Sequence, residues 1–347
     1  MQLTIKEVKP GMRLEKAVVS PDNGKILLAA DTTLSIKNID KLKEMNIEII
    51  DIADRNTVFI SPTDKMAESL ISDFRAYLKK TCPSRPEANK NDNVLKIAKQ
   101  LDMIIPQIAK NEKILSQLVE MKIVNNVYLY ECGIRAAVLS GIVAGCMGLS
   151  LEDIVCCISG ALIHDIGLCE MPTLIGVEDM TPQAEQLYHE HPTYGYYFAV
   201  QNNISRKIAE SIQAHHERWD GQGYPKGLKG EEIPICARII SVCADYIKQV
   251  KYMKVAPYIA VEALYGGSGM YYDYNVVQAF VNNIPIYPLG EVVKLSTKEV
   301  GIVSNIRQNE GPRPVVKVYY NRVNRPITED KIIDLGKERT VFIEEIL

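Results

Sequence analysis

All five histidines of this 347-residue chain lie between positions 164 and 216, in three clusters. The clusters are His164-Asp165, His189 with His191, and His215-His216. Imidazole is the commonest side-chain ligand for transition metals, and it works together with carboxylates. A lone histidine is more often a hydrogen-bonded core residue. Five histidines gathered in three tight clusters instead favour a metal site, so the fold must bring these segments together.

The overall composition narrows the possible partners and the cellular location. The net charge of -3 and the pI near 6.0 provide no general attraction for DNA or RNA, so we expect no nucleic-acid partner. The eight cysteines form no CxxC pair, which is typical of reduced thiols in a cytoplasmic protein. No apolar stretch reaches about 18 residues without a charge, and no signal pattern is visible, so we expect no membrane partner.

Residues 1–62 predict a small N-terminal accessory module of the α+β type. Asn23-Gly24 lies between two apolar runs, which is a strong hairpin signal. Ser35 can cap a short helix that carries Ile39 and Leu42 on one face. Residues 47–52 then have the pattern of a strand. No catalytic cluster is visible here, which favours an accessory or docking role.

Residues 63–93 predict one helix and a linker, and residues 94–285 predict a helical bundle. Met66, Leu70, Phe74 and Leu78 recur at intervals of four, as on one face of a helix. Residues 81–92 are polar and contain two prolines, which indicates the linker. Apolar residues then recur at helical spacing. The long helices at 64–80 and 94–121 can pack within the chain or against a second copy, so a homodimer is possible.

Residues 286–347 predict a small C-terminal β extension. Short strand patterns occupy residues 291–295, 301–304 and 315–320, separated by turn signals. The predicted fold class is therefore multidomain and mainly α: a helical metal-binding domain flanked by an N-terminal α+β module and the C-terminal β extension.

Local patterns around the histidines indicate how they are placed. Pro192 suits a first helical turn, which puts His191 at a helix N-terminus and leaves His189 pointing elsewhere, into solvent. His215-His216 closes a helix that begins near Ser205, and a glycine-rich loop follows at residues 221–230. The carboxylate of Asp165 has two oxygens and can bridge two metals.

These residues also match a family pattern. The matching segments are His164-Asp165-Ile-Gly167, His191-Pro-Thr-Tyr-Gly195, His215-His-Glu217, Asp220-Gly-Gln-Gly-Tyr-Pro225 and Arg238 to Asp245. Over residues 125–285 the chain resembles the HD-GYP subgroup of the HD phosphohydrolase superfamily. The combination of motifs is highly specific, and the flanking regions look like segments that are often fused to such domains in bacteria.

The resemblance implies a metal-dependent phosphodiesterase that hydrolyses cyclic di-GMP to pGpG or GMP. Its cofactors would be two divalent transition metals, iron or manganese. By position, one metal would take His164, Asp165 and Asp245, and the second would share Asp165 and take His191, His215 and His216. A hydroxide bridging the metals at Asp165 would attack phosphorus. The turn Gly223-Tyr224-Pro225 would lie against the dinucleotide, with Tyr224 reaching a phosphate or a metal-bound water.

The chain departs from the family pattern at four places. Cys132 stands where the family has a metal-binding histidine, and it can be either a ligand or a buried thiol. Tyr128 replaces the glutamate of three-metal members, which argues against a third metal. Leu168 replaces a phosphate-side lysine. The substrate arginine is missing, and Lys254 can stand in for it as a point charge.

Three functions follow from the combined pattern. The first is an active cyclic di-GMP phosphodiesterase. The second is a degenerate protein, weak or inactive in catalysis, that serves as a receptor or signalling scaffold for cyclic di-GMP or metal. The third is a hydrolase of another nucleotide phosphoester, since similar sites are reused for several substrates.

Overall fold

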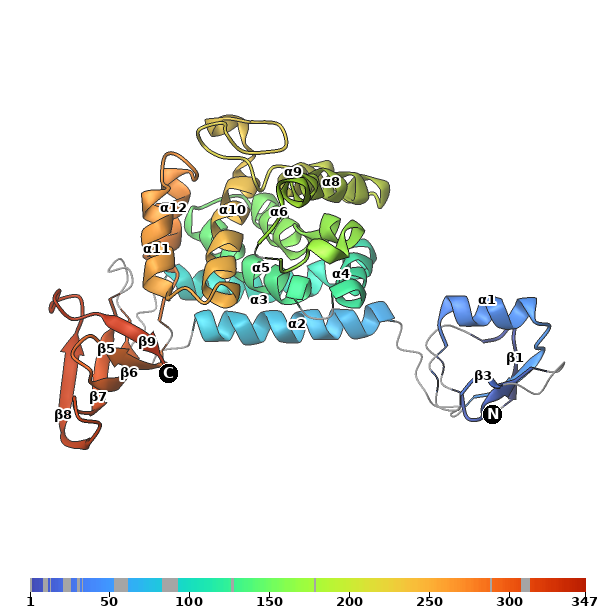
Figure 1. The fold of residues 1–347 in the computed structure, drawn as a ribbon, viewed down its shortest axis with the longest axis horizontal. Helices are drawn as coiled ribbons and strands as arrows, with labels where there is room; N and C mark the ends of the chain where they lie inside the picture. Colours follow the sequence, from blue (N-terminus) through green and yellow to red (C-terminus); the bar gives the residue numbers. More distant parts are fainter. Residues whose placement is uncertain are drawn as a thin grey trace. The chain divides into compact units, whose positions relative to one another are not determined.

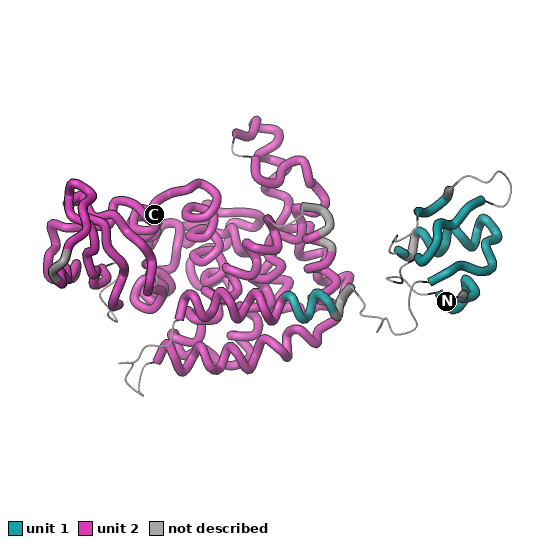
Figure 2. The backbone as a smooth tube through the Cα atoms, turned by 90° about the horizontal axis from the view of Figure 1, so that it is seen from below, with its two compact units in different colours: residues 1–69 teal, residues 70–347 magenta. Residues whose placement is uncertain are grey.

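The computed structural model describes residues 2–8, 12, 14–20, 26–29, 32, 34–52, 62–82, 93–125, 128–177, 179–287, 289–306 and 313–347. The chain divides into two compact units, residues 1–69 and 70–347 (Figure 2). The division falls inside helix α2 (Pro62–Thr81), which continues from one unit into the other. Of the linker predicted at residues 81–92, Thr81 is the last residue of α2, and residues 83–92 lie outside the described residues.

The N-terminal unit has the predicted α+β character. Its elements are β1 (Gln2–Thr4), β2 (Val18–Val19), β3 (Ile26–Leu28), α1 (Ile36–Glu44) and β4 (Ile49–Asp51). Strand β1 pairs with β4, and β2 pairs with β3 as the hairpin signal predicted, although the Asn23-Gly24 turn itself lies outside the described residues. Ser35 caps α1, with the Asn38 amide donating to its hydroxyl at 3.1 Å. Ile39 and Leu42 are buried in the small core of this unit.

The second unit contains the predicted helical bundle (Figure 1). Its α-helices after α2 are α3 (Asn93–Ile108), α4 (Glu112–Asn125), α5 (Tyr128–Cys146), α6 (Leu151–Leu162), α7 (Pro182–Tyr188), α8 (His191–Gln201), α9 (Arg206–Gln213), α10 (Ile235–Ile247), α11 (Pro257–Gly266) and α12 (Tyr274–Asn283). Short 3-10 turns lie at η1 (Ile166–Glu170), η2 (Pro172–Leu174) and η3 (Gly230–Glu232), and a π-helical turn, η4 (Lys248–Tyr252), follows α10. The mainly α fold class is confirmed.

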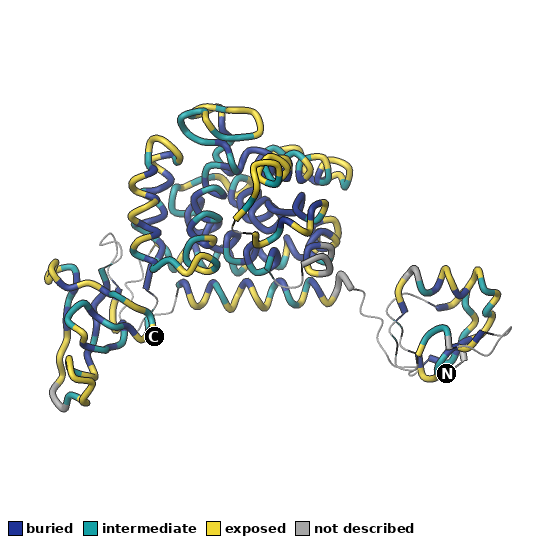
Figure 3. The backbone as a smooth tube through the Cα atoms, in the orientation of Figure 1, coloured by how far each residue is buried: buried dark blue, intermediate teal, exposed yellow. Residues whose placement is uncertain are grey.

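Helix α5 forms the centre of the bundle and packs against α6 and α10 (Figure 3). Gly133 permits the close approach of α6, because a Cβ at this position would overlap the carbonyl oxygen of Leu162. Among the described helices, α5 alone is long and apolar enough to cross a membrane. Its burial in the bundle accounts for that composition, since 78% of its apolar 18-residue segment is buried inside the structure. The apolar stripe of α2 is also confirmed, with Leu70 and Phe74 fully buried.

The C-terminal β extension is a five-stranded antiparallel sheet in the order β8-β7-β6-β5-β9. The strands are β5 (Val292–Leu295), β6 (Val300–Asn305), β7 (Val315–Tyr320), β8 (Pro326–Asp334) and β9 (Ile343–Ile346). The three predicted strands are confirmed, and the sequence reasoning missed β8 and β9. Strand β8 is rich in charged residues and has little of the apolar alternation that marks a strand.

Candidate metal centre

The histidine clusters meet at a cavity of about 1020 Å³ in the second unit. His164 and Asp165 follow the C-terminus of α6, and His215 and His216 follow α9. All four line the cavity, while His191, the first residue of α8, is fully buried behind it. The fold therefore brings together residues up to 52 positions apart, as the clustering predicted.

Three of the imidazoles are oriented in the same way. In each, Nδ1 lies within hydrogen-bond distance of the backbone carbonyl oxygen three residues earlier: 2.9 Å for His164, 2.6 Å for His191 and 2.6 Å for His215. A carbonyl oxygen only accepts, so Nδ1 carries the proton and Nε2 of the neutral ring presents a lone pair. This arrangement is typical of metal-binding histidines.

The Nε2 atoms of these three rings converge on one carboxylate. They lie 3.2 Å, 3.4 Å and 3.7 Å from Asp165 oxygens for His164, His191 and His215, respectively. One donor atom from each of Asp165, His191, His215 and His216 lies within 4.8 Å of the others. These four residues are the set that the resemblance assigns to one metal.

Burial and mutual charge shift the protonation of these groups. Without a metal, Nε2 can carry a proton toward Asp165. Burial alone would raise the pKa of Asp165, but the charge of protonated His164 and hydrogen bonds from protonated Nε2 atoms of the surrounding histidines outweigh it and hold that pKa well below 3.8. Burial opposes charging of His164, yet the adjacent Asp165 raises the pKa of this imidazole above 6.5. Burial lowers the pKa of His215 to about 4 and that of His216 well below 6.5.

The metal-free protein should consequently lose stability in mild acid. Between pH 6.5 and about 4, the unfolded chain takes up protons on His215 and His216 that the folded protein does not bind. The free energy of unfolding should therefore fall with pH by about 1.4 kcal/mol per pH unit for each residue. The pKa of His164 is raised in the folded protein, so this residue changes the free energy of unfolding with pH only above 6.5, its pKa in the unfolded chain. That range lies outside this window.

Urea unfolding of chelator-treated protein at pH 6.5 and 5.5 measures this slope. The variant His216→Gln should have a shallower slope than the unmodified chain. An identical slope in both proteins would contradict a neutral, buried His216.

Asp245, on α10, lines the same cavity but is not part of the four-residue cluster. Its Oδ2 accepts hydrogen bonds from the Tyr272 hydroxyl at 2.5 Å and from Gln249 Nε2 at 2.7 Å. These two donors fix the orientation of the carboxylate. The assignment of Asp245 to a metal shared with His164 and Asp165 stays a prediction.

Cys132 on α5 also lines the cavity and lies outside the four-residue cluster. Burial raises the pKa of its thiol to about 12. This geometry favours the interpretation as a buried thiol over that as a metal ligand.

The predicted substrate residues are placed differently from one another. Tyr224 lines the cavity, and its ring stacks on His216 at 4.9 Å and on His189 at 4.0 Å between ring centroids. His189 is therefore half-buried against Tyr224, and our expectation that it points into solvent is wrong. Gly223, Pro225 and Lys254 are not among the residues that line the cavity, and Lys254 is exposed, so their substrate contacts remain predictions.

Comparison with known proteins identifies two families within the chain. Residues 151–276 match the HD domain family, and residues 292–347 match a KOW domain associated with HD domains. The first match contains every histidine of the cavity together with Asp165 and Asp245. The second contains the whole C-terminal sheet.

Several curated relatives carry one functional name. The chain is 29% identical over 248 residues to a cyclic di-GMP phosphodiesterase of Pseudomonas aeruginosa, covering 68% of this chain and 58% of the relative. It is 35% identical over 158 residues to a cyclic di-GMP phosphodiesterase of Thermotoga maritima, covering 42% of each chain. A third relative, the cyclic di-GMP phosphodiesterase PdeB of Borreliella burgdorferi, is 28% identical over 214 residues, covering 60% of this chain and 55% of the relative.

The chain contains an HD domain at residues 151–276. It spans about half the length of the curated relatives it matches.

Two cations of the HD domain line the cavity and were missed in the sequence. Lys248 begins the π-helical turn η4, and its charge is among the causes that lower the pKa of His216. Arg218 stacks over the Tyr271 ring at 4.0 Å, and its buried Nε has no hydrogen-bond partner in the described structure. Lys248 lies three residues after Asp245, and this spacing places both on one helical face. The spacing could therefore have indicated Lys248 as a residue of the site.

Glu217 holds the glycine-rich loop of the HD domain. Its buried carboxylate accepts hydrogen bonds from the amides of Lys226 at 2.7 Å and Leu228 at 3.0 Å. Gly223 fits against this residue, since a Cβ there would lie 2.5 Å from Glu217 Cα. Because Tyr224 follows Gly223, these contacts with Glu217 position the tyrosine ring beside His216.

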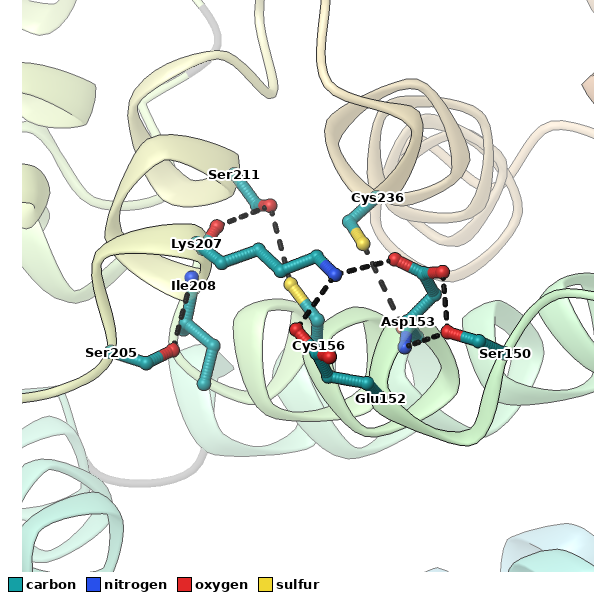
Figure 4. A network of polar contacts seen from close by, with 9 residues as sticks. All are labelled: Ser150, Glu152, Asp153, Cys156, Ser205, Lys207, Ile208, Ser211 and Cys236. Carbon is teal, nitrogen blue, oxygen red and sulfur yellow. Dashed lines mark hydrogen bonds and ion pairs between the residues drawn. The ribbon is translucent and has the colours of Figure 1, made fainter.

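A polar network joins the three helices that precede or carry the ligands (Figure 4). Lys207 of α9 forms an ion pair with Asp153 of α6 at 2.8 Å. The Cys156 thiol of α6 contacts the Ser211 hydroxyl of α9 at 3.5 Å, and the Cys236 thiol of α10 donates to the Asp153 carbonyl at 3.6 Å. These contacts fix the relative positions of the segments that end in His164-Asp165 and His215-His216.

Proposed function

We propose that the HD domain is a metal-dependent phosphodiesterase whose substrate is cyclic di-GMP. The observation that supports it most strongly is the convergence of three Nε2 atoms on the Asp165 carboxylate. The names of the relatives support the choice of substrate. Eight cysteines without a disulfide among the described residues agree with action in the cytoplasm.

The donor set of the cavity fits divalent transition metals. Unprotonated imidazole nitrogens and a carboxylate oxygen, crowded within a few ångströms, repel one another unless a cation or proton lies between them. One metal would be held by Asp165, His191, His215 and His216. A second would be held in part by His164 and Asp165. Nitrogen and oxygen donors suit iron or manganese. When bound, such metals supply Lewis acidity toward water and toward phosphate oxygens.

Side chains of the chain itself would position the phosphodiester. Lys248 and Arg218 line the cavity and would neutralise the phosphate charge, and the Arg218 guanidinium also forms an ion pair with Asp220. Burial raises the pKa of Tyr224, so its hydroxyl keeps its proton at neutral pH and can donate to a phosphate oxygen. The stacking of Tyr224 on His216 brings that donor beside the metal ligands.

A receptor that binds the dinucleotide without hydrolysing it is the second candidate. The position of Cys132, outside the ligand cluster, favours it because this removes one family ligand from the centre.

The deciding experiment is cyclic di-GMP hydrolysis by anaerobically purified full-length protein loaded with iron or manganese. Products separated by chromatography should include pGpG or GMP, and chelation should abolish them. Saturable binding of cyclic di-GMP to fully metal-loaded protein without either product would refute hydrolysis and support the receptor. Turnover of another cyclic dinucleotide alone would refute the choice of substrate.

A further inference from the structure

We infer that Tyr128, Cys132 and Tyr252 form a binding subsite for a purine base of the substrate, and do not bind an additional metal. We call these three residues the aromatic wall. The inference rests on the proposed function for the identity of the nucleotide, and it assigns one face of the cavity to the base.

The aromatic wall combines residues from two distant segments. Tyr128 and Cys132 lie one turn apart on α5, and Tyr252 ends the π-helical turn η4. The rings of Tyr128 and Tyr252 lie 4.2 Å apart between centroids, and the Tyr252 hydroxyl donates to the Tyr128 carbonyl at 3.4 Å. These contacts join the two segments at the lining of the cavity.

The aromatic wall lies outside the cluster of metal-ligand atoms. Cys132 is absent from the group of donor atoms that meet within 4.8 Å, and the Tyr252 hydroxyl donates to the Tyr128 carbonyl. Tyrosine and cysteine side chains are ordinarily neutral at pH 7, so the wall offers no anionic donor of the carboxylate kind. What the wall presents to the cavity is mainly the two tyrosine rings.

The wall belongs to the same cavity as the metal ligands. His164, Asp165 and His216 line that cavity together with Tyr128, Cys132 and Tyr252. Leu168 and Met253, which also line it, extend the uncharged surface. A phosphate held at the histidines and Lys248 would leave its attached nucleoside to occupy an uncharged region, and aromatic rings are the usual stacking partners of bases.

The test compares two ligands that differ in the nucleoside. Binding of GMP and of inorganic phosphate to the metal-loaded, full-length protein is measured by calorimetry for the unmodified chain, for Tyr252→Leu and for Tyr252→Phe. We expect Tyr252→Leu to weaken GMP binding by about 5–150-fold, the usual loss for one stacked base, and to leave phosphate binding unchanged. Tyr252→Phe retains the ring and should bind GMP nearly as the unmodified chain does.

Three further variants complete the test. Tyr128→Leu should repeat the selective loss of GMP binding if Tyr252→Leu fails to fold, and Tyr194→Leu, an exposed tyrosine of α8 outside the cavity lining, should have no effect. Equal weakening of both ligands, or unchanged GMP binding, would overturn the inference. So would a loss of bound metal, measured by elemental analysis, in Cys132→Ala.

These results are independent of turnover. A selective loss of GMP binding in protein that does not hydrolyse cyclic di-GMP would support the base subsite and refute the phosphodiesterase. Hydrolysis of cyclic di-GMP with no selective loss of GMP binding would support the phosphodiesterase and refute the base subsite.

Discussion

Replacement of Asp165 by asparagine is expected to abolish phosphodiester hydrolysis and to release most of the bound metal. Among the described residues, Asp165 is the carboxylate that faces the Nε2 atoms of His164, His191 and His215. The amide removes the negative charge and directs either a weaker oxygen donor or two N–H groups toward the metal. Loss of a residue that only orients a ligand costs about 10–100-fold in metal affinity, so loss of a shared ligand should exceed about 100-fold.

The matched control is Asp102→Asn, which removes a carboxylate of α3 in the same unit. Asp102 does not line the cavity and pairs with Arg75, and both side chains are about half exposed. Such a pair contributes about 1 kcal/mol or less to stability, so this variant should keep its metal and its activity. Metal content and product formation are measured on both proteins. Metal retention in Asp165→Asn at the level of the control would show that the centre does not depend on this carboxylate.

Substitution of Gly167 by alanine is expected to cause the largest loss of stability among single changes near the site. Gly167 lies in η1, directly after His164-Asp165, where the turn packs against the start of α8. A Cβ at this position would overlap the carbonyl oxygen of His191 and lie 2.7 Å from the amide nitrogen of Gly195. Both neighbours are backbone atoms that cannot move aside as a side chain can. We expect a loss of about 3 kcal/mol or more in the free energy of unfolding.

Gly266→Ala provides the control for this prediction. Gly266 ends α11, and a Cβ there would meet no atom within 4 Å. Alanine should be neutral or stabilise the protein by up to about 1 kcal/mol, because glycine loses more backbone freedom in a helix. Thermal or urea unfolding of both variants gives the comparison. A Gly167→Ala protein as stable as Gly266→Ala would show that η1 and α8 are not closely packed.

The sequence predicted those parts of the fold that depend on local patterns. The stripe of α2, the cap at Ser35 and the start of α8 at His191 each follow from residues within one or two helical turns. The grouping of Asp165 with His191, His215 and His216 was predicted from the family resemblance, because no local pattern states which helix ends meet.

The remaining features depend on contacts between distant segments. Tyr272 reaches Asp245 from 27 residues away, and Tyr252 meets Tyr128 across 124 residues. Lys248 was not predicted as a site residue, because its place in the cavity depends on the π-helical turn that follows α10. Propensity does not encode such a turn, since it forms where packing shifts one residue out of the regular helix.

The hydrogen bonds at Nδ1 bear on how this domain can change during evolution. Many metal centres orient their histidines with carboxylate side chains, which mutation can remove. Here the acceptors for His164, His191 and His215 are peptide carbonyls, which every amino acid possesses. Side-chain replacement at Ala161, Tyr188 or Ile212 leaves these acceptors in place. The orientation of these three imidazoles therefore does not depend on the side chains at the acceptor positions. Substitutions elsewhere in the cavity, such as cysteine at position 132 or leucine at position 168, can accumulate while the remaining imidazoles keep their orientation.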